Sequence, residues 1–267
     1  APSCRPGASI AKPITKYDAR MHTIIRSPEP IDLSGEWTLC LDREDIGIEA
    51  GWYQGRLPVE QTIHLPGSLQ AQGFGDAPGP ETPWVGTVHE EVWADPKYAP
   101  YRTQAHFKVP FFLQPDTYYS GAAWYQRSVD IPESWAGRRV VLTLERPHWE
   151  TRVWINDTHI GVNRILSAPH LYELSAVLQL GANRITIRVQ NGEVLRVGPN
   201  AHSVTDHTQS NWNGIVGELS LTAEATVSFD DLQVYPELEK NGIRVTAEIA
   251  GAVASAGALT LQATVSK

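Results

Sequence analysis

The stretch from residue 202 to residue 217 concentrates side chains that can hydrogen-bond a polyol. Its donors, acceptors and one flat ring give the candidates for substrate binding: Asp206, His207, Thr208, Gln209, Asn211 and Trp212. An indole covers the C–H face of a sugar ring, while directional hydrogen bonds distinguish the hydroxyl groups. These residue types favour carbohydrate recognition. Composition alone leaves an ordinary polar loop of a β-sandwich as an equal alternative.

A second candidate pair, His148 and Trp149, follows a predicted strand and Pro147. We expect a strand-to-strand turn at this point, near the same edge of the fold as the 202–217 stretch. Two interpretations stay open, because the pair either lines a sugar site or only packs.

Metal binding is not predicted. His202, Asp206 and His207 match no zinc spacing, and no single loop holds the three acidic residues that a calcium site needs. We therefore expect neither a metal nor a cofactor.

Short alternating strands must hold these residues. Eight or so short strands are predicted, at 33–41, 62–65, 122–131, 139–144, 150–156, 159–161, 183–189 and 217–223, and apolar and polar residues alternate in 33–41, 122–131 and 183–189. Asn213-Gly214 is a turn signal that leads into the last of the eight strands. Short strands separated by turns, without a strong helical pattern, predict an all-β fold built as an antiparallel sandwich.

The strand pattern divides the chain into three parts. Residues 1–30 contain five prolines and predict an extended N-terminal arm, and residues 31–224 hold the sandwich. Within the sandwich, residues 68–117 are rich in Gly, Pro and aromatic residues, which predicts an ordered excursion over one face. Three further strands follow at 227–235, 242–249 and 259–265. An immunoglobulin-like sandwich needs about seven strands, so 225–267 predicts the first strands of an incomplete second domain.

Composition bounds the class of protein. The 267 residues are 42% hydrophobic and 19% charged, which is typical of a globular chain, and the net charge is −8. No cluster of Lys and Arg is present, which argues against nucleic acid or an anionic membrane as a partner. Nine Trp and nine Tyr suit a surface for amphipathic ligands such as sugars, although most of the Trp residues are expected in the core.

Two features bear on cellular location. Cys4 and Cys40 are the only cysteines, and a disulfide between them is a hypothesis without a framework of further cysteines behind it. No apolar run reaches transmembrane length and no leader segment is visible, so a removed leader and an intracellular chain both remain open. A periplasmic or secreted location is favoured over the cytoplasm.

Three groups of motifs, in this order and spacing, resemble the N-terminal part of glycoside hydrolase family 2, the β-galactosidase/β-glucuronidase family. The resemblance covers roughly residues 31 to 224. Its motifs are Leu33-Ser-Gly-Glu-Trp37 with Leu65-Pro-Gly-Ser68, Ala123-Trp-Tyr-Gln-Arg127 with Val153-Trp-Ile-Asn156 and His159-Ile-Gly161, and Asn211-Trp-Asn-Gly-Ile-Val-Gly217 with Leu219-Ser-Leu221.

The resemblance implies a galactose-binding-domain-like jelly roll, then an immunoglobulin-like sandwich, then a (β/α)₈ barrel. It also implies retaining hydrolysis by two glutamates of the barrel, about 5 Å apart. No barrel is present in this sequence, so no catalytic residue is assigned and the chain is expected to be inactive alone. Its expected partners are carbohydrate and the rest of its own polypeptide.

In several family members, an Asp six positions before the Gly of the closing motif bonds the terminal sugar. Counting back from Gly214 gives Thr208, with Asp206 two residues away as a substitute if the loop is shifted. The identity of the terminal sugar therefore stays open. The leading hypothesis is the non-catalytic sugar-binding region of a β-galactosidase-like glycosidase. The alternatives are a free-standing carbohydrate-binding module and an adhesion or scaffold sandwich without a ligand.

Overall fold

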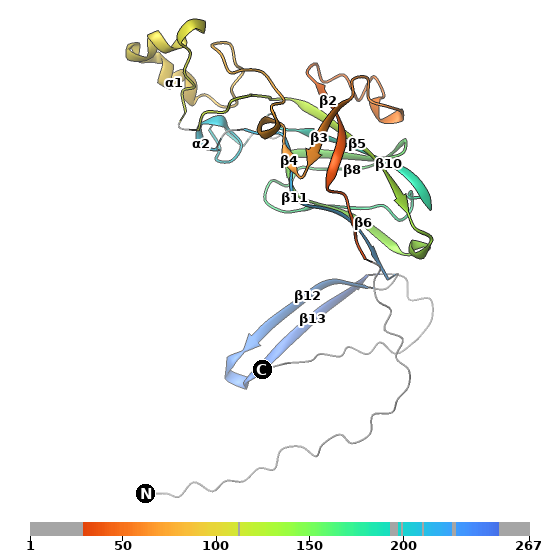
Figure 1. Ribbon diagram of the computed structural model, residues 1–267. Helices are drawn as coiled ribbons and strands as arrows, with labels where there is room; N and C mark the ends of the chain where they lie inside the picture. The colour runs from red at the N-terminus through yellow and green to blue at the C-terminus, as the bar shows by residue number, and fades with distance from the viewer. Residues whose placement is uncertain are drawn as a thin grey trace, which may run out of the picture.

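Two antiparallel sheets make up most of the molecule (Figure 1). The computed structural model describes residues 29–111, 113–192, 197–198, 200–209, 211–225 and 228–250. The six-stranded sheet has the order β3 (Gln61–Leu65), β2 (Gly35–Asp42), β5 (Ala122–Ile131), β10 (Gly181–Gln190), β7 (Glu150–Ile155) and β8 (Thr158–Asn163). The five-stranded sheet has the order β1 (Ile31–Asp32), β11 (Gly214–Glu224), β6 (Arg139–His148) and β9 (His170–Glu173), and β4 (Gly67–Ser68) also pairs with β11. The predicted all-β sandwich is confirmed.

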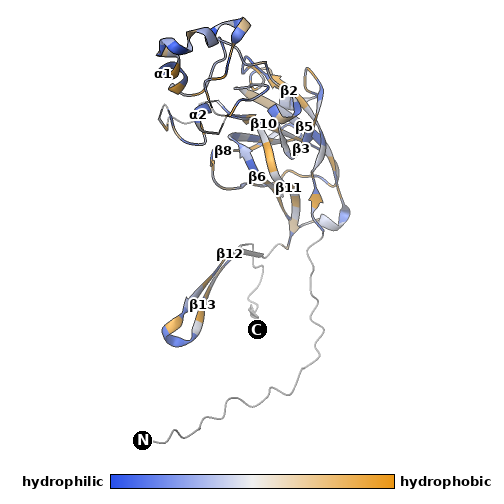
Figure 2. Ribbon diagram, turned by 60° about the vertical axis from the view of Figure 1, so that its left-hand side comes forward, coloured by the Kyte–Doolittle hydropathy of each residue, from blue (hydrophilic) through white to orange (hydrophobic). Residues whose placement is uncertain are grey.

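The main core lies between the two sheets. Alternate residues of β10, Ile185, Ile187 and Val189, are fully buried there, and they belong to the same apolar cluster as Leu142 and Leu144 of β6. Alternation places every second side chain on one face of a strand, which is why the sequence pattern could identify this face. Figure 2 shows the resulting hydrophobic colouring along the strands of the sandwich.

A second buried layer lies on the other face of the six-stranded sheet. Trp124 and Trp154 stack with their ring centroids 5.1 Å apart, and Tyr53 stacks on Trp154 at 5.2 Å. The segment between β2 and β3, with its 3₁₀ turn at Trp52–Gln54, supplies Tyr53 and covers these rings. Trp124 and Trp154 are buried, as is expected for most of the Trp residues, but they do not belong to the inter-sheet core, whereas Trp37 does.

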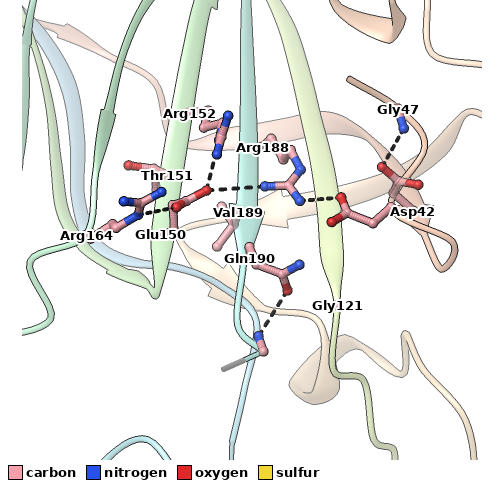
Figure 3. Close-up of polar contacts among 12 residues, drawn as sticks. Asp42, Gly47, Gly121, Glu150, Thr151, Arg152, Arg164, Arg188, Val189 and Gln190 are labelled. Carbon is pink, nitrogen blue, oxygen red and sulfur yellow. Dashed lines mark hydrogen bonds and ion pairs between the residues drawn. The ribbon is translucent and has the colours of Figure 1, made fainter. Parts of the chain in front are cut away.

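An ionic cluster holds this covering segment on the sheet (Figure 3). Glu150 accepts hydrogen bonds from Arg152 at 2.9 Å and from Arg164 at 2.5 Å, and it lies 3.5 Å from Arg188. Arg188 also pairs with Asp45 in the covering segment. Because Glu150 and Arg188 are both buried, each needs the other groups of the cluster as counter-charges.

The predicted excursion between β4 and β5 is ordered and carries helical segments, of which α1 (Val88–Ala94) is the longest α-helix. The other segments are 3₁₀ turns at Gln70–Gln72, Pro96–Arg102 and Gln104–His106. Trp84, Phe111 and Tyr118 form its buried aromatic cluster, with Trp84 and Phe111 packed edge to face at 5.3 Å. Burial of these rings gives the excursion a small core of its own, as its aromatic content predicted.

After the sandwich, β12 (Ser228–Glu237) and β13 (Gly242–Ala250) form a two-stranded hairpin. Val234 faces Val245, and the pair of Pro236 and Ile243 lies two residues further along, so these side chains share one face of the hairpin. Val234 and Ile243 are both more than half exposed, so this apolar face has no cover among the described residues. The predicted third strand, 259–265, lies outside the described residues, as do the arm over 1–28 and Cys4. The disulfide therefore stays a hypothesis, and Cys40 is a buried thiol of β2.

No helix within the described ranges is both long and apolar enough to cross a membrane.

Candidate carbohydrate site

The residues that the sequence singled out gather at one end of the sandwich. The loop after β10 carries the one-turn helix α2 (Asp206–Gln209), and β11 starts from it at Gly214. The corner between β6 and β7, which contains His148 and Trp149, lies at the same end, because His148 contacts this loop. In both Figure 1 and Figure 2, α2 has α1 of the excursion on one side and the sandwich on the other.

Asp206 fastens the loop to the excursion. Its backbone N–H donates to Val85 O at 3.0 Å, and its Oδ2 accepts the Val85 N–H at 2.6 Å. Tyr118 donates its hydroxyl to the same Oδ2 at 2.9 Å, and the Asn211 N–H donates to Oδ1 at 2.9 Å. Burial raises the pKa of Asp206, against the hydrogen bonds that lower it. The carboxylate is 1% exposed, so the structure uses it inside the protein.

Three buried asparagines form the base of the loop. Asn211 Nδ2 donates to Asn191 O at 2.8 Å, while its Oδ1 accepts from Asn191 Nδ2 at 3.3 Å. Asn213 Nδ2 donates to Gly121 O and Val189 O at 3.0 and 3.1 Å, and its Oδ1 accepts the Tyr125 hydroxyl at 2.8 Å. A buried amide with all these partners fixes the backbone on either side of it.

Gly214 completes this base, because β4 passes close to its backbone. The glycine has φ +145°, and a Cβ added there would lie 2.8 Å from the Cα of Ser68. The Asn-Gly pair therefore serves as the start of β11 and its pairing with β4, where no larger residue fits.

Trp212 lies at the surface between these buried neighbours. Its ring stacks on His148, with centroids 4.8 Å apart and planes at 30°. The His148 ring is held between two carbonyl oxygens, since Nδ1 lies 2.8 Å from Trp212 O and Nε2 lies 3.0 Å from Ser203 O. Burial lowers the pKa of His148, although both carbonyls favour its protonated form. His148 therefore supports Trp212 from behind, and the indole keeps a partly exposed face.

The remaining predicted residues also include a buried side chain and a partly exposed one. Trp149 is buried and donates its Nε1 to Arg164 O at 2.9 Å, which makes it a packing residue in this structure. His207 is partly exposed, and its Nδ1 lies 2.8 Å from Thr205 Oγ1. Thr208 and Gln209 belong to α2, and their side chains are outside what the structure describes.

A pocket of about 460 Å³ opens on the excursion side of the same end. Its wall includes Arg43 and Asp76, which pair at 2.5 Å, and Tyr119, whose ring lies 5.7 Å from the Arg43 guanidinium. Tyr118 forms another part of the lining, and it is the residue that bonds Asp206. Tyr118 thus belongs both to the wall of the pocket and to the contact that holds the loop. Neither Arg43 nor Asp76 was predicted from the sequence as a site residue.

The residues that the sequence analysis missed are mainly those that receive the loop. Asn191 follows directly after β10, and Tyr118 and Tyr119 stand just before β5; their types were visible, but their roles depend on partners about 20 to 90 positions away. Among the described residues, no group of three or more His, Cys, Asp or Glu side chains is arranged to hold a metal.

Known proteins resemble the chain over these elements. Residues 82–225 match the model of glycosyl hydrolases family 2, sugar binding domain. The chain is 21% identical over 82% of its length to the β-galactosidase large subunit of Leuconostoc lactis, and 32% identical over 77 residues to the β-glucuronidase of Felis catus. Its fold is similar to that of a Ruminococcus gnavus β-glucuronidase, with a TM-score of 0.59 and 19% identity over 84% of the chain.

The chain spans about a third of the length of both the Leuconostoc subunit and the Ruminococcus structure, 34% and 33% respectively. The family model covers more than half of the chain and includes β5 to β11, α2 and the loop that carries Asp206. The chain therefore belongs to glycosyl hydrolase family 2, of which it holds the sugar-binding domain.

Proposed function

We propose that this chain is the N-terminal, non-catalytic region of a retaining, β-galactosidase-like enzyme of family 2. In this proposal, the loop before β11 helps to position the terminal sugar for two glutamates of a catalytic barrel elsewhere in the polypeptide. The names of the relatives support the class, because they are a β-galactosidase subunit and β-glucuronidases. The chain alone is inactive, since it lacks that barrel.

The observation that carries the proposal is a partly exposed Trp residue on a rigid base. Trp212 lies between the buried Asn211 and Asn213, and its ring is backed by His148. A site that positions a substrate needs its contact groups held by a shell of fixed neighbours. Trp212 then stacks on the sugar and His207 donates or accepts a hydrogen bond, while Asp206 and Asn211 act as positioning residues.

The domain arrangement belongs to the same proposal. Residues 1–30 are the arm, 31–224 the jelly roll, and 225–267 the first strands of an immunoglobulin-like sandwich. The apolar face of the β12–β13 hairpin supports this division, because exposed β-branched and aliphatic side chains on one face of a hairpin need a second sheet to cover them. Further strands of the same polypeptide are the proposed cover, and the catalytic barrel is the proposed partner.

The stereochemistry of hydrolysis tests the proposed class. The full-length polypeptide that contains this chain is incubated with nitrophenyl β-galactoside and nitrophenyl β-glucuronide, and the anomer released first is identified by NMR. We expect hydrolysis of the galactoside, with the β-anomer formed first. An inverted product contradicts the retaining mechanism. Hydrolysis of neither glycoside, together with binding of sugars by the 267-residue chain alone, favours the free-standing carbohydrate-binding module.

A further inference from the structure

A second hollow lies entirely on the excursion, away from the Trp212 ring. It encloses about 420 Å³, and its lining combines rings with two polar side chains: Trp93, Tyr98, Tyr101, Phe111, Lys108 and Gln114. All of these come from a short part of the chain, from α1 to the segment before β5. Aromatic walls with a few polar groups are typical of pockets that bind an amphipathic ring.

The pocket is anchored to the sandwich through its floor. Phe111 packs edge to face on Trp84 at 5.3 Å, and Trp84 packs on Tyr118 at 4.8 Å. Tyr118 in turn bonds Asp206 of the loop. The Trp93 ring is held by Phe107 at 5.9 Å in an edge-to-face contact. Phe111 is therefore fixed by buried neighbours, and Trp93 packs against the partly buried Phe107.

The charge of the lining is opposite to that of the chain. The protein has 30 Asp and Glu residues and a net charge of −8, yet the lining contains Lys108 and no carboxylate. The Lys108 ammonium lies 4.7 Å from the centroid of the Tyr101 ring, and no carboxylate of the described residues pairs with it within 4.0 Å. Lys97, in contrast, is paired with Asp95 at 2.7 Å.

From this combination we propose that the pocket binds an acidic sugar unit of a larger glycan. The rings of Trp93, Tyr98 and Tyr101 cover the C–H face of the pyranose, and Lys108 pairs with a carboxylate or sulfate group on the sugar. Gln114 provides a donor and an acceptor for a hydroxyl group. The inference rests on the proposed function only in taking carbohydrate as the ligand class, and it adds a subsite apart from the loop that carries Trp212.

Titration of oligosaccharides into the 267-residue chain, followed by calorimetry and by the NMR signals of the indole N–H groups, tests the subsite. The probes are trigalacturonate, a sulfated galactose disaccharide and neutral galactotriose, each at low and at high salt. We expect the acidic probes to bind and galactotriose to bind more weakly. Lys108→Met should weaken the acidic probes about three- to fivefold, as an exposed ion pair allows, and leave the neutral probe unchanged. Lys240→Met is the matched control, because it makes the same charge change on the β12–β13 side.

The outcomes separate the alternatives. Binding of trigalacturonate alone identifies a carboxylate as the anionic group, and binding of the sulfated disaccharide alone identifies a sulfate. Equal binding of neutral and acidic probes, unchanged binding in Lys108→Met, or no binding by the folded chain would each overturn the subsite. A full-length polypeptide without glycosidase activity would refute the proposed function and leave these binding results standing.

Discussion

Asp206 and Val85 hold each other through two reciprocal hydrogen bonds. The Asp206 N–H donates to the Val85 carbonyl at 3.0 Å, and the Asp206 carboxylate accepts the Val85 N–H at 2.6 Å. The two residues are 121 positions apart, and they join the loop before β11 to the excursion before α1. The end of the domain that carries Trp212 is therefore assembled from two long segments that the sheets alone do not hold together.

Removal of this carboxylate should destabilise the domain. Asp206→Ala leaves the Val85 and Asn211 N–H groups without their acceptor, which we expect to cost about 3 kcal/mol in the free energy of unfolding. Asp206→Asn keeps one acceptor oxygen and should cost less. Urea unfolding followed by tryptophan fluorescence measures both, with the exposed Asp116→Ala as control. If Asp206→Ala unfolds at the same urea midpoint as the wild type, the clamp does not contribute.

Replacement of the Asn213 side-chain amide by a carboxylate should destabilise the domain. Its Nδ2 donates to two carbonyl oxygens, so Asn213→Asp would set an anion against Gly121 O and Val189 O inside the protein. We expect a loss of about 3 kcal/mol or more, because a buried polar atom then faces acceptors only. Gln61→Glu makes the same chemical change on the exposed edge of β3 and should cost little. Equal urea midpoints for the two variants would contradict the asparagine base.

Glu150 provides a test that depends on pH. Burial alone would raise its pKa, but the hydrogen bonds from Arg152 and Arg164 outweigh burial and lower it below the usual value of 4.5. A lowered folded-state pKa contributes stability that is present above pH 4.5 and is lost as the pH falls through the folded value. Glu150→Gln should therefore cost about 3 kcal/mol at pH 7 and progressively less below pH 4.5. A difference between wild type and variant that stays constant from pH 7 to pH 3.5 would exclude this role; Glu133→Gln on the surface is the control.

His170, unlike Glu150, should stabilise the folded domain in its uncharged form. Its Nδ1 lies 2.6 Å from Thr151 Oγ1 and its Nε2 lies 2.7 Å from Ile165 O, an arrangement that suits a neutral ring donating from Nε2. Burial lowers the pKa of His170 below 6.5. The unfolded chain then binds more protons than the folded one, so this contribution is complete above pH 6.5 and falls as the pH decreases. The stability advantage of wild type over His170→Gln should shrink between pH 7 and pH 5, whereas exposed His106→Gln should match the wild type throughout; an advantage that grows on acidification would contradict a neutral ring.

The positions of the strands and their inward faces could be predicted from sequence because alternation is a local signal. Ile185, Ile187 and Val189 show it within five residues. The fate of Asp206 and Asn211 could not be predicted in this way. Both look like exposed sugar ligands in the sequence, but their burial depends on Val85, Tyr118 and Asn191, which lie far away along the chain. The same limit applies to Trp124, because alternation does not reveal that a loop covers the second face of its sheet.

In the proposed function, the end of this domain that carries Trp212 positions a sugar for a catalytic barrel. The most direct test is kcat/KM of the full-length polypeptide on the nitrophenyl glycoside that it hydrolyses, compared between wild type, Trp212→Ala and Trp212→Phe. Trp52→Phe, on the far side of the six-stranded sheet, is the control for loss of an indole. We expect Trp212→Ala to lower kcat/KM about tenfold or more, as loss of a stacked ring allows, with Trp212→Phe in between and Tm preserved. Unchanged kcat/KM in a folded Trp212→Ala protein would mean that the Trp212 ring does not position the substrate.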